Sequence, residues 1–378
     1  MLHRRIDIVF GTRPEAIKLA PVAAALHAQG MAVRLVATGQ HRDLARAAVD
    51  LGPYETRHLD VSPMADPFTY AHSCASAYAA GNLPRPAMII VQGDTASAYG
   101  GALAAADLDL PLAHVEAGLR SHDRANPWPE EDFRIAIDRL AALHFAPTEL
   151  AARHLREEGC DDSVHVVGNS GVDALKALLA TLPPRTGPRG DERRLLITCH
   201  RREHWGEPLA DLIAATIDLA ERHPRLHIDV ALHPNPAIGQ AWRRALERTS
   251  PVRLLAPLTH RQMLLAMRSA DLILSDSGGM QEEAPYVGTP LFILRRRTER
   301  PEGIASGQLK LIGIERQRIV EEVEHFFASP RVRRAMINGA EPYGDGRTGP
   351  RIAAIIAERL ALSSLPARPR QERPAASL

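Results

Sequence analysis

The chain has 378 residues, enough for two domains that each bury a core. Its formal net charge is +1, so the charge balance gives no support for nucleic acid or an anionic membrane surface as a partner. Three cysteines without a CxxC pair argue against a disulfide scaffold or a zinc site and are typical of a reducing cytoplasm. Because no apolar run approaches about 20 residues, we expect a cytoplasmic protein without a transmembrane helix.

Short apolar runs alternate with helical patterns through the first half of the chain. We expect strands near residues 6–10, 33–38, 88–91, 112–115, 144–147 and 164–167, and helices over about 15–29 and 96–106. This alternation predicts βαβ units and a parallel sheet. A segment rich in proline and glycine at 182–190 then predicts an exposed linker.

The same pattern restarts after the linker. We expect strands near 195–198, 227–232, 272–275 and 291–294, and helices over 207–222, 259–269, 278–287, 315–328 and 349–361. The segment 363–378 is rich in proline, serine and arginine and is predicted to be disordered. The fold class is therefore α/β, with two doubly wound domains facing a cleft. The N-terminal domain would span 1–182 and the C-terminal domain 190–345.

The motif GTRPEAIK follows the first predicted strand and opens the first predicted helix. Pro14 suits a first helical turn, and Arg13 with the free N–H groups there could hold an anion. The motif is neither GxGxxG nor a Walker A loop, which argues against a standard dinucleotide or NTPase site. Only three of the 46 basic residues are lysines, so Lys18 within this motif is more informative than usual. The alternative is an ordinary β–α turn with a surface arginine.

Carboxylates follow two strands that should be neighbours. Asp94 lies in QGDT, and Glu116 lies in HVEAGLR. The carboxyl ends of strands in α/β proteins face the crevice where ligands bind. Asp94 alone could be a helix N-cap, but together with Glu116 it favours a catalytic carboxylate cluster.

Two more carboxylates, Glu130 and Glu131, follow Trp128 in the motif PWPEE. One of them could simply complement the dipole of the helix that begins there. We favour Glu130 as the catalytic or substrate-binding residue and consider Glu131 the less suitable partner. Two carboxylates near one reacting carbon can serve as acid and base on its two faces.

The first strand of the second half ends in TCHRRE. His200, beside Arg201 and Arg202, could donate to a phosphate or carry a proton, although one histidine among 17 is usually structural. Cys199 is better explained as a small buried residue than as a nucleophile. The turn HPNP at 233–236 is a weaker candidate for ligand contact.

The strongest anion signal is SDSGGMQEE, where a strand ends and a helix begins. Backbone N–H groups around Ser277, Gly278 and Gly279 could cradle a diphosphate, because glycine allows close approach. Glu283 could accept hydrogen bonds from ribose hydroxyls, unless it is only a solvated helix charge. Arg300, in TERPE, could complete the phosphate clamp.

These motifs, in this order and approximate spacing, resemble the bacterial non-hydrolysing UDP-N-acetylglucosamine 2-epimerases over about residues 6–315. The resemblance implies two Rossmann-like domains of the glycosyltransferase-B type, with the C-terminal helix at about 349–361 crossing back to complete the first domain, and commonly a homodimer. It implies reversible conversion of UDP-GlcNAc to UDP-ManNAc with no cofactor, neither NAD nor metal. In the family, UDP is eliminated across C1–C2 to give 2-acetamidoglucal and is then added back with the opposite configuration at C2.

The resemblance also carries roles onto matching positions of this chain. The diphosphate would be held by Arg13, His200, Ser277, Gly278, Gly279 and Arg300, with Lys18 nearby. Glu283 would bind the ribose. The C2 proton and the sugar would be handled by Asp94, Glu116 and Glu130, with His200 also counted among the catalytic residues.

Three features depart from the family pattern. Met263, with His260 close by, stands where many relatives stack an aromatic ring on uracil. Relatives with a second, allosteric UDP-GlcNAc site carry a segment of the QHRQ type and a basic residue in the helix that follows. In this chain the segment is QHRD at 40–43, and 62–83 contains no Arg or Lys. We therefore hypothesise that allosteric activation by UDP-GlcNAc is weakened or absent. Arg296 and Arg297 replace an acidic residue and a threonine, which points to a more anionic sugar such as a uronate.

Four other functions stay open at this stage. The enzyme could hydrolyse UDP-GlcNAc to ManNAc and UDP, or epimerise a UDP-diacetamido-uronic acid. It could be a glycosyltransferase of the same architecture, although three converging carboxylates favour proton abstraction over simple transfer. A non-enzymatic nucleotide-sugar sensor would not need those carboxylates.

Overall fold

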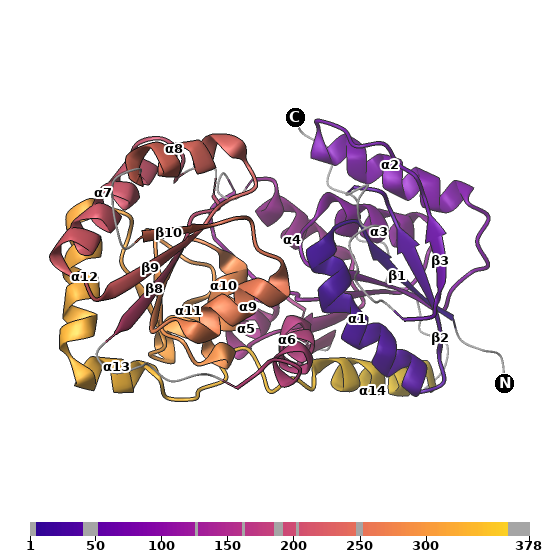
Figure 1. Ribbon diagram of the computed structural model, residues 1–378. Coiled ribbons are helices and arrows are strands. Elements are labelled where there is room, and N and C mark those ends of the chain that lie inside the picture. The colour runs from indigo at the N-terminus through magenta and orange to yellow at the C-terminus, as the bar shows by residue number, and fades with distance from the viewer. Residues whose placement is uncertain are drawn as a thin grey trace. The chain divides into compact units, whose positions relative to one another are not determined.

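The computed structural model describes residues 5–40, 52–124, 128–160, 163–184, 192–201, 204–246 and 252–361. The chain divides into two compact units (Figure 1). Unit 1 comprises residues up to Ala174 and from Gly344 onward, and unit 2 comprises Leu175–Tyr343. Most of the predicted linker and the predicted disordered tail lie outside the described residues.

Unit 1 is built on a parallel sheet with the strand order β3-β2-β1-β4-β5-β6-β7. Its strands are β1 Arg5–Phe10, β2 Ala32–Ala37, β3 Glu55–His58, β4 Met88–Gln92, β5 Leu112–Val115, β6 Leu143–Ala146 and β7 Val164–Val166. Its helices are α1 Arg13–Ala28, α2 Pro67–Ala80, α3 Ala96–Asp107, α4 Glu130–Leu140, α5 Glu149–Glu157 and α14 Thr348–Ala361, while α6 Ser170–Ala180 crosses into unit 2.

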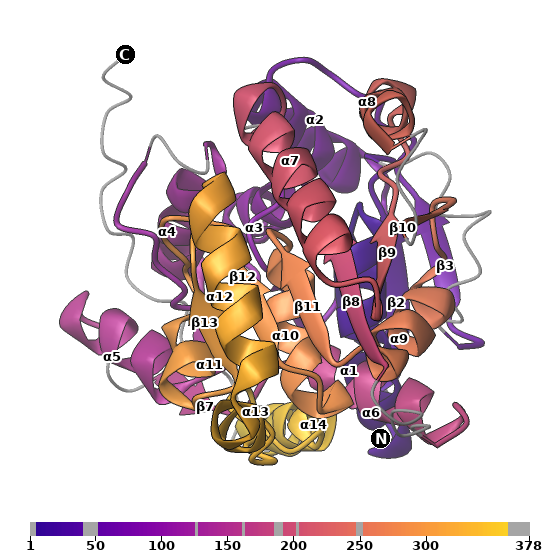
Figure 2. The same ribbon diagram turned by 60° about the vertical axis from the view of Figure 1, so that its left-hand side comes forward.

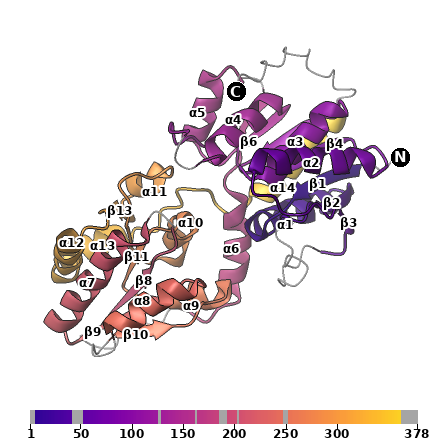
Figure 3. The same ribbon diagram turned by 90° about the horizontal axis from the view of Figure 1, so that it is seen from above.

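Both faces of the unit 1 sheet are covered because side chains alternate along its buried strands. In β1, Ile6 and Ile8 pack with the cluster that contains residues of α1 and α14, whereas Val9 packs with the cluster from α2, α3 and α4. The helix α14 runs beside α1 (Figure 1), and α2 packs against α3 (Figure 3). The C-terminal helix thus belongs to the core of unit 1, with Ile352 and Ile356 fully buried.

Unit 2 repeats this plan with the strand order β10-β9-β8-β11-β12-β13, again all parallel. Its strands are β8 Arg193–Thr198, β9 Leu226–Ala231, β10 Val252–Leu255, β11 Leu272–Ser275, β12 Leu291–Ile293 and β13 Leu309–Leu311. Its helices are α7 Glu207–Arg222, α8 Pro236–Leu246, α9 His260–Ser269, α10 Gly278–Val287, α11 Pro301–Ala305, α12 Arg316–Ala328 and α13 Pro330–Met336.

The two faces of the unit 2 sheet are also covered by different helices. Leu195 and Ile197 of β8 join the cluster that contains α7 and α12, which lie side by side (Figure 2). Leu196, between them in sequence, joins the cluster from α9 and α10 instead. Each unit is therefore a doubly wound α/β sheet, as the alternating pattern predicts.

Strands and helices predicted from apolar periodicity are confirmed to within one or two residues at most ends. The pattern missed β3, whose four residues are all exposed, because an exposed edge strand carries no apolar alternation. It also missed β10 and β13, which are short strands with few buried side chains. In the described part of the chain, no helix combines the length and apolar character needed to cross a membrane.

Candidate active site

The strand order of each sheet reverses direction at one point, between β1 and β4 in unit 1 and between β8 and β11 in unit 2. Ligands of open α/β sheets bind outside the carboxyl ends of the strands at such points. Arg13 and Asp94 follow β1 and β4, and His200 and Ser277 follow β8 and β11. Each unit therefore places its predicted residues at its own switch point.

Glu116 lies just beyond β5 in a strained conformation and has two close partners. Its backbone φ of 67° is in the left-handed region, which non-glycine residues rarely adopt. Its Oε2 accepts hydrogen bonds from Lys18 Nζ and from Gln92 Nε2, each at 2.6 Å. We expected Lys18 near a diphosphate, and in this structure its partner is one of the predicted carboxylates. The sequence had given Gln92 no role.

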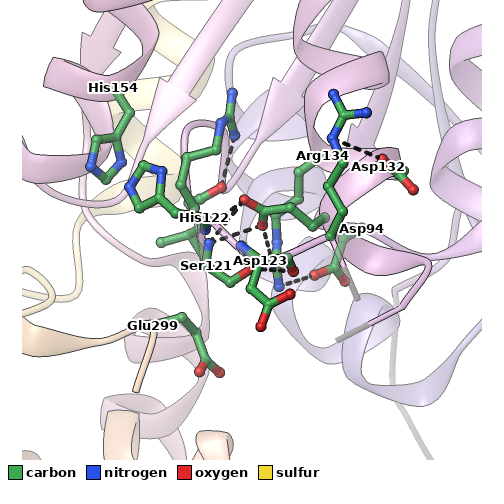
Figure 4. A network of polar contacts seen from close by, with 12 residues as sticks. Asp94, Ser121, His122, Asp123, Asp132, Arg134, His154 and Glu299 are labelled. Atoms are coloured by element: carbon green, nitrogen blue, oxygen red, sulfur yellow. Dashed lines mark hydrogen bonds and ion pairs between the residues drawn. The ribbon is translucent and has the colours of Figure 1, made fainter. Parts of the chain in front are cut away.

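Asp94 does not cap a helix, which removes the structural alternative for this residue. The N-cap of α3 is Thr95, whose hydroxyl accepts from the Ala98 backbone N–H at 3.0 Å. The Asp94 carboxylate instead forms an ion pair with Arg134 of α4 (Figure 4). Arg134 Nη1 also donates to Glu131 Oε2 at 3.0 Å, so one guanidinium joins two carboxylates.

Glu131, and not Glu130, is the buried anchor of this network. It is 1% exposed, and its two oxygens accept from the backbone N–H groups of Ser121, at 2.9 and 3.0 Å, and of His122, at 3.0 Å (Figure 4). Although burial raises the pKa of Glu131, these bonds and Arg134 together hold it below its usual value. Glu130 is half-buried in the first turn of α4. The two adjacent glutamates thus differ sharply in surroundings.

A second buried network lies behind these residues and fixes the loops that carry them. Asp138 accepts from His114 Nδ1 at 2.6 Å and from Arg120 Nη2 at 2.8 Å. His114 Nε2 lies 2.9 Å from the carbonyl oxygen of Gly93, the residue before Asp94. Burial raises the pKa of Asp138, but the charges of His114 and Arg120 outweigh it and lower that pKa overall. Asp138 therefore stays ionised, and His114 of β5 connects it to the loop that carries Asp94.

In unit 2, the buried carboxylate Asp276 orders the loop after β8. It accepts from the backbone N–H groups of His200, at 2.8 Å, and Arg201, at 3.0 Å, and lies 2.8 Å from His204 Nδ1. The ligand atoms of Cys199, His204 and Asp276 lie within 4.8 Å of one another, a spacing that a metal ion could use. Burial and Asp276 raise the pKa of the Cys199 thiol far above its usual value, however, so a thiolate ligand is disfavoured. We interpret this cluster as structural.

The His200 ring is largely buried and neutral at neutral pH. Burial is the main cause that lowers its pKa, and nearby His233 lowers it further, against an opposing effect of Asp276. Its ring packs edge-on to that of His233, with centroids 5.5 Å apart. A neutral imidazole has one N–H group, which can donate one hydrogen bond to a phosphate oxygen.

Arg300 is the N-cap of α11, and its side chain reaches the start of α10, as the predicted phosphate clamp requires. A Cβ atom placed on Gly278 would be only 3.0 Å from Arg300 Nη1. The guanidinium bonds Glu282 Oε1 through Nε at 2.7 Å and also contacts Glu299. Burial opposes ionisation of Glu299, but the charges of Arg300 and Arg295 lower its pKa to about 2. Glu282 and the ionised Glu299 therefore hold Arg300 in position beside Gly278.

The remaining predicted residues of unit 2 surround the start of α9 and α10. Glu283 Oε1 lies 2.7 Å from His260 Nε2, so the predicted ribose acceptor already pairs with a neighbouring side chain. Met263, half-buried, packs against the core cluster of α9 and α10. Ser277 is the N-cap of α10 without a side-chain capping bond, and a Cβ on Gly279 would meet no atom closer than 3.9 Å. This helix start has room for a ligand.

For two groups of predicted residues, the structure provides few contacts that bear on the predicted role. Arg13 begins α1 with an exposed side chain, and it has no ion pair among the described residues. Arg296 and Arg297 are also exposed, Arg296 with 91% of its side chain accessible. Of the QHRD segment only Gln40 is described, and it accepts from Ser97 Oγ at 2.6 Å. The rest of this segment, on which the hypothesis of weakened or absent allosteric activation depends, lies outside the described residues.

Two parallel sheets with the same doubly wound order, each presenting polar residues at its switch point, define the class of protein. It is an α/β protein with two Rossmann-like units, of the glycosyltransferase-B type. In this class, function depends on the residues at the switch points and not on the fold itself.

Comparison with known proteins identifies the family. The family model described as UDP-N-acetylglucosamine 2-epimerase matches residues 24–357. A UDP-N-acetylglucosamine 2-epimerase of Escherichia coli K12 is 35% identical over 372 residues, which cover 93% of this chain and 98% of that protein. The chain therefore belongs to the UDP-N-acetylglucosamine 2-epimerase family.

Solved structures agree with this assignment. The UDP-GlcNAc 2-epimerase from Neisseria meningitidis bound to UDP-GlcNAc is 33% identical, with a TM-score of 0.84, covering 95% of this chain and 100% of that one. The S. aureus MnaA–UDP co-structure is also 33% identical, with a TM-score of 0.84, covering 96% of this chain and 99% of that one.

Proposed function

We propose that the protein interconverts UDP-GlcNAc and UDP-ManNAc by inverting C2 of the sugar, without releasing free sugar. The observation that carries the proposal is the cluster at the carboxyl end of the unit 1 sheet. There Lys18 and Gln92 hold the carboxylate of Glu116, and Arg134 holds that of Asp94. A family member with paired, oriented carboxylates at this edge has the groups needed to remove a proton from carbon and return it.

We propose that unit 2 binds the uridine diphosphate. The start of α10 offers backbone N–H groups at Gly278 and Gly279 to phosphate oxygens, and Arg300 adds a fixed positive charge beside them. Neutral His200 would donate a further hydrogen bond. Glu283 would accept from the ribose hydroxyls, exchanging its contact with His260 for one with the nucleotide.

In unit 1 the carboxylates would act on the sugar. A carboxylate takes the proton from C2, the C1–C2 double bond forms, and the bond between C1 and the UDP oxygen breaks. In the return step the UDP oxygen attacks C1 while a carboxylic acid delivers a proton to the other face of C2. Asp94, Glu116 and Glu130 are the candidates for these transfers. Because the C2 proton is weakly acidic, stabilisation of the departing UDP must lower much of the barrier.

The relatives support this assignment of ligands. One structure of a family member contains UDP-GlcNAc, and another of comparable similarity contains UDP. We further propose that the protein acts as a homodimer in the cytoplasm. We also propose residues 1–182 with the C-terminal helix, and 190–345, as its two functional domains.

Proton NMR of the purified protein with UDP-GlcNAc in D₂O, with EDTA and without NAD, tests the proposal. UDP-ManNAc that carries deuterium at C2 is expected. Free ManNAc with UDP would instead show the hydrolysing reaction, and an unchanged spectrum would contradict the substrate assignment, so that a UDP-uronate would be tested next. Asp94→Asn is the control, because it should abolish turnover and largely keep UDP binding, whereas a nucleotide-sugar sensor would keep its output.

A further inference from the structure

Glu15 is a buried carboxyl group to which the proposed reaction gives no role. It forms a capping box at the start of α1, where its Oε2 accepts from the backbone N–H groups of Thr12, at 2.7 Å, and Gly11, at 3.1 Å. A capping-box glutamate needs only such local bonds. Glu15, however, is 2% exposed, and its Oε1 accepts a third bond, at 2.7 Å, from the hydroxyl of Thr95, 80 residues away.

The Thr95 hydroxyl connects this carboxylate to the proposed catalytic residues. Thr95 is the N-cap of α3 and follows Asp94 directly. Its hydroxyl oxygen accepts a hydrogen bond from the Ala98 N–H at 3.0 Å, and its O–H group donates one to Glu15 Oε1. Glu15 thereby joins the turn that carries Asp94 to the turn that carries Arg13.

The two turns are packed too closely to tolerate extra atoms. A Cβ atom on Gly11 would lie 1.8 Å from Ser97 Oγ and 2.4 Å from Thr38 Oγ1. Those two hydroxyls are themselves hydrogen-bonded at 2.8 Å. The ends of β1, β2 and β4 thus interlock at the switch point, and Glu15 contributes an acidic group to the contact.

We propose that Glu15 is a positioning residue whose ionised carboxylate holds Asp94 in place relative to Arg13 and thereby sets the rate of turnover. The inference rests on the proposed function, because it assigns Asp94 a part in the reaction. Glu15 itself touches no reacting atom. Its effect is on the geometry of a neighbouring turn, where small displacements are costly to the rate.

Ionisation decides whether all three bonds can form. The carboxylate accepts from Gly11, Thr12 and Thr95 together. Protonation of Oε1 turns that oxygen into a hydroxyl donor and a weaker acceptor, so the bond from the Thr95 hydroxyl is weakened or reversed. Burial raises the pKa of Glu15 to about 7, against the lowering effect of these hydrogen bonds. Turnover should therefore rise with pH through about 7.

Other groups in this region differ from Glu15 in how they titrate. Its own helix also carries Arg13 and Lys18, and His27 lies in the last turn at the opposite end of that helix from Glu15. Neighbouring elements bring Asp94 after β4, Glu116 after β5, and Tyr70 and Cys74 on α2. Burial raises the pKa of Cys74 to about 11 and that of Tyr70 well above its usual value, so both stay neutral near pH 7.

The test compares Glu15→Gln, Thr95→Val, their double mutant and the control Thr95→Ser in the full-length protein. We would measure kcat and KM for UDP-GlcNAc from about pH 5.5 to about pH 9. In Glu15→Gln, kcat at high pH should fall by on the order of 10-fold to 100-fold with a nearly unchanged KM, and the acid limb near pH 7 should disappear. Thr95→Val should give a similar loss, the double mutant no further loss, and Thr95→Ser near-normal turnover.

Loss of folding does not account for the expected result. The raised pKa means that the contribution of Glu15 to stability is present below pH 4.5 and is lost as pH rises through about 7. Glu15→Gln lacks that penalty and should stay folded at high pH, which urea unfolding checks. The inference about Glu15 would be overturned, and the proposed function would stand, if Glu15→Gln kept kcat within about twofold of wild type and an unchanged acid limb. An inactive wild-type protein would overturn the proposed function and this inference with it.

Discussion

The adjacent residues Glu130 and Glu131 allow one substitution to be made in two different surroundings. In Glu131→Gln, the side chain keeps one oxygen for the N–H groups of Ser121 and His122, but its NH₂ group then faces the donor Nη1 of Arg134. A charge-assisted hydrogen bond is lost and two donors oppose each other. We expect the free energy of unfolding to fall by about 2–4 kcal/mol.

Glu130→Gln should show the opposite pattern. This side chain is half-buried in the first turn of α4 and is the proposed catalytic group. We expect kcat to fall by on the order of 100-fold or more, the usual contribution of an acid–base group, with stability changed by less than about 0.5 kcal/mol. Glu131→Gln should lower kcat less, once its folded fraction is taken into account.

Urea unfolding and initial rates with UDP-GlcNAc measure both variants under the same conditions. The pKa of Glu131 is lowered from 4.5, so its stabilising effect is present above pH 4.5 and is lost as pH falls through the folded-state value. The stability difference between wild type and Glu131→Gln should therefore shrink at low pH. Equal destabilisation by the two substitutions, or a loss of activity without loss of stability in Glu131→Gln, would refute this reasoning.

Lys18→Met removes the ion pair to Glu116 and should lower kcat by roughly 10-fold to 100-fold, the equivalent of one charge-assisted bond. The Kd for UDP, measured by calorimetry, should stay nearly constant. A loss of UDP affinity as large as the loss of kcat would instead support the prediction that Lys18 contacts the diphosphate. Gly118→Ala should cost at least about 2 kcal/mol more than Gly159→Ala. Both glycines have positive φ, but a Cβ on Gly118 would lie 2.2 Å from a backbone oxygen, whereas a Cβ on Gly159 would meet nothing within 4 Å. Equal unfolding midpoints would contradict that contact. Glu283→Gln should raise KM for UDP-GlcNAc several-fold with little change in kcat, and a selective loss of kcat would exclude the ribose role.

Much of the fold follows from patterns that are local in sequence. Buried parallel strands need runs of apolar residues, and the helices between them need an apolar stripe, so both are visible without any knowledge of contacts. Once a parallel sheet is predicted, every loop after a strand must lie at the same edge. For this reason Asp94, Glu116, His200 and Ser277 could be recognised as site candidates from their place after a strand.

The pairing of side chains could not be predicted in this way. Lys18 and Glu116 are 98 residues apart, and their contact depends on strand order and on the rotation of α1 against the sheet. The sequence could not show which of Glu130 and Glu131 would be buried, because adjacent residues of one helix point in different directions. The T-x-x-E capping-box pattern at Thr12 was a signal for Glu15, but it indicates only a helix start.

The sequence by itself therefore determined the two doubly wound sheets, the loops that carry chemistry and the family. The tertiary structure decided which charged groups lie together, as in the contact of Glu15 with Thr95 or of Asp94 with Arg134. The physical reason is one of range. Secondary structure and strand-end loops follow from interactions within a few residues, whereas the position and ionisation of a buried carboxylate depend on groups that only the packed sheet brings near it.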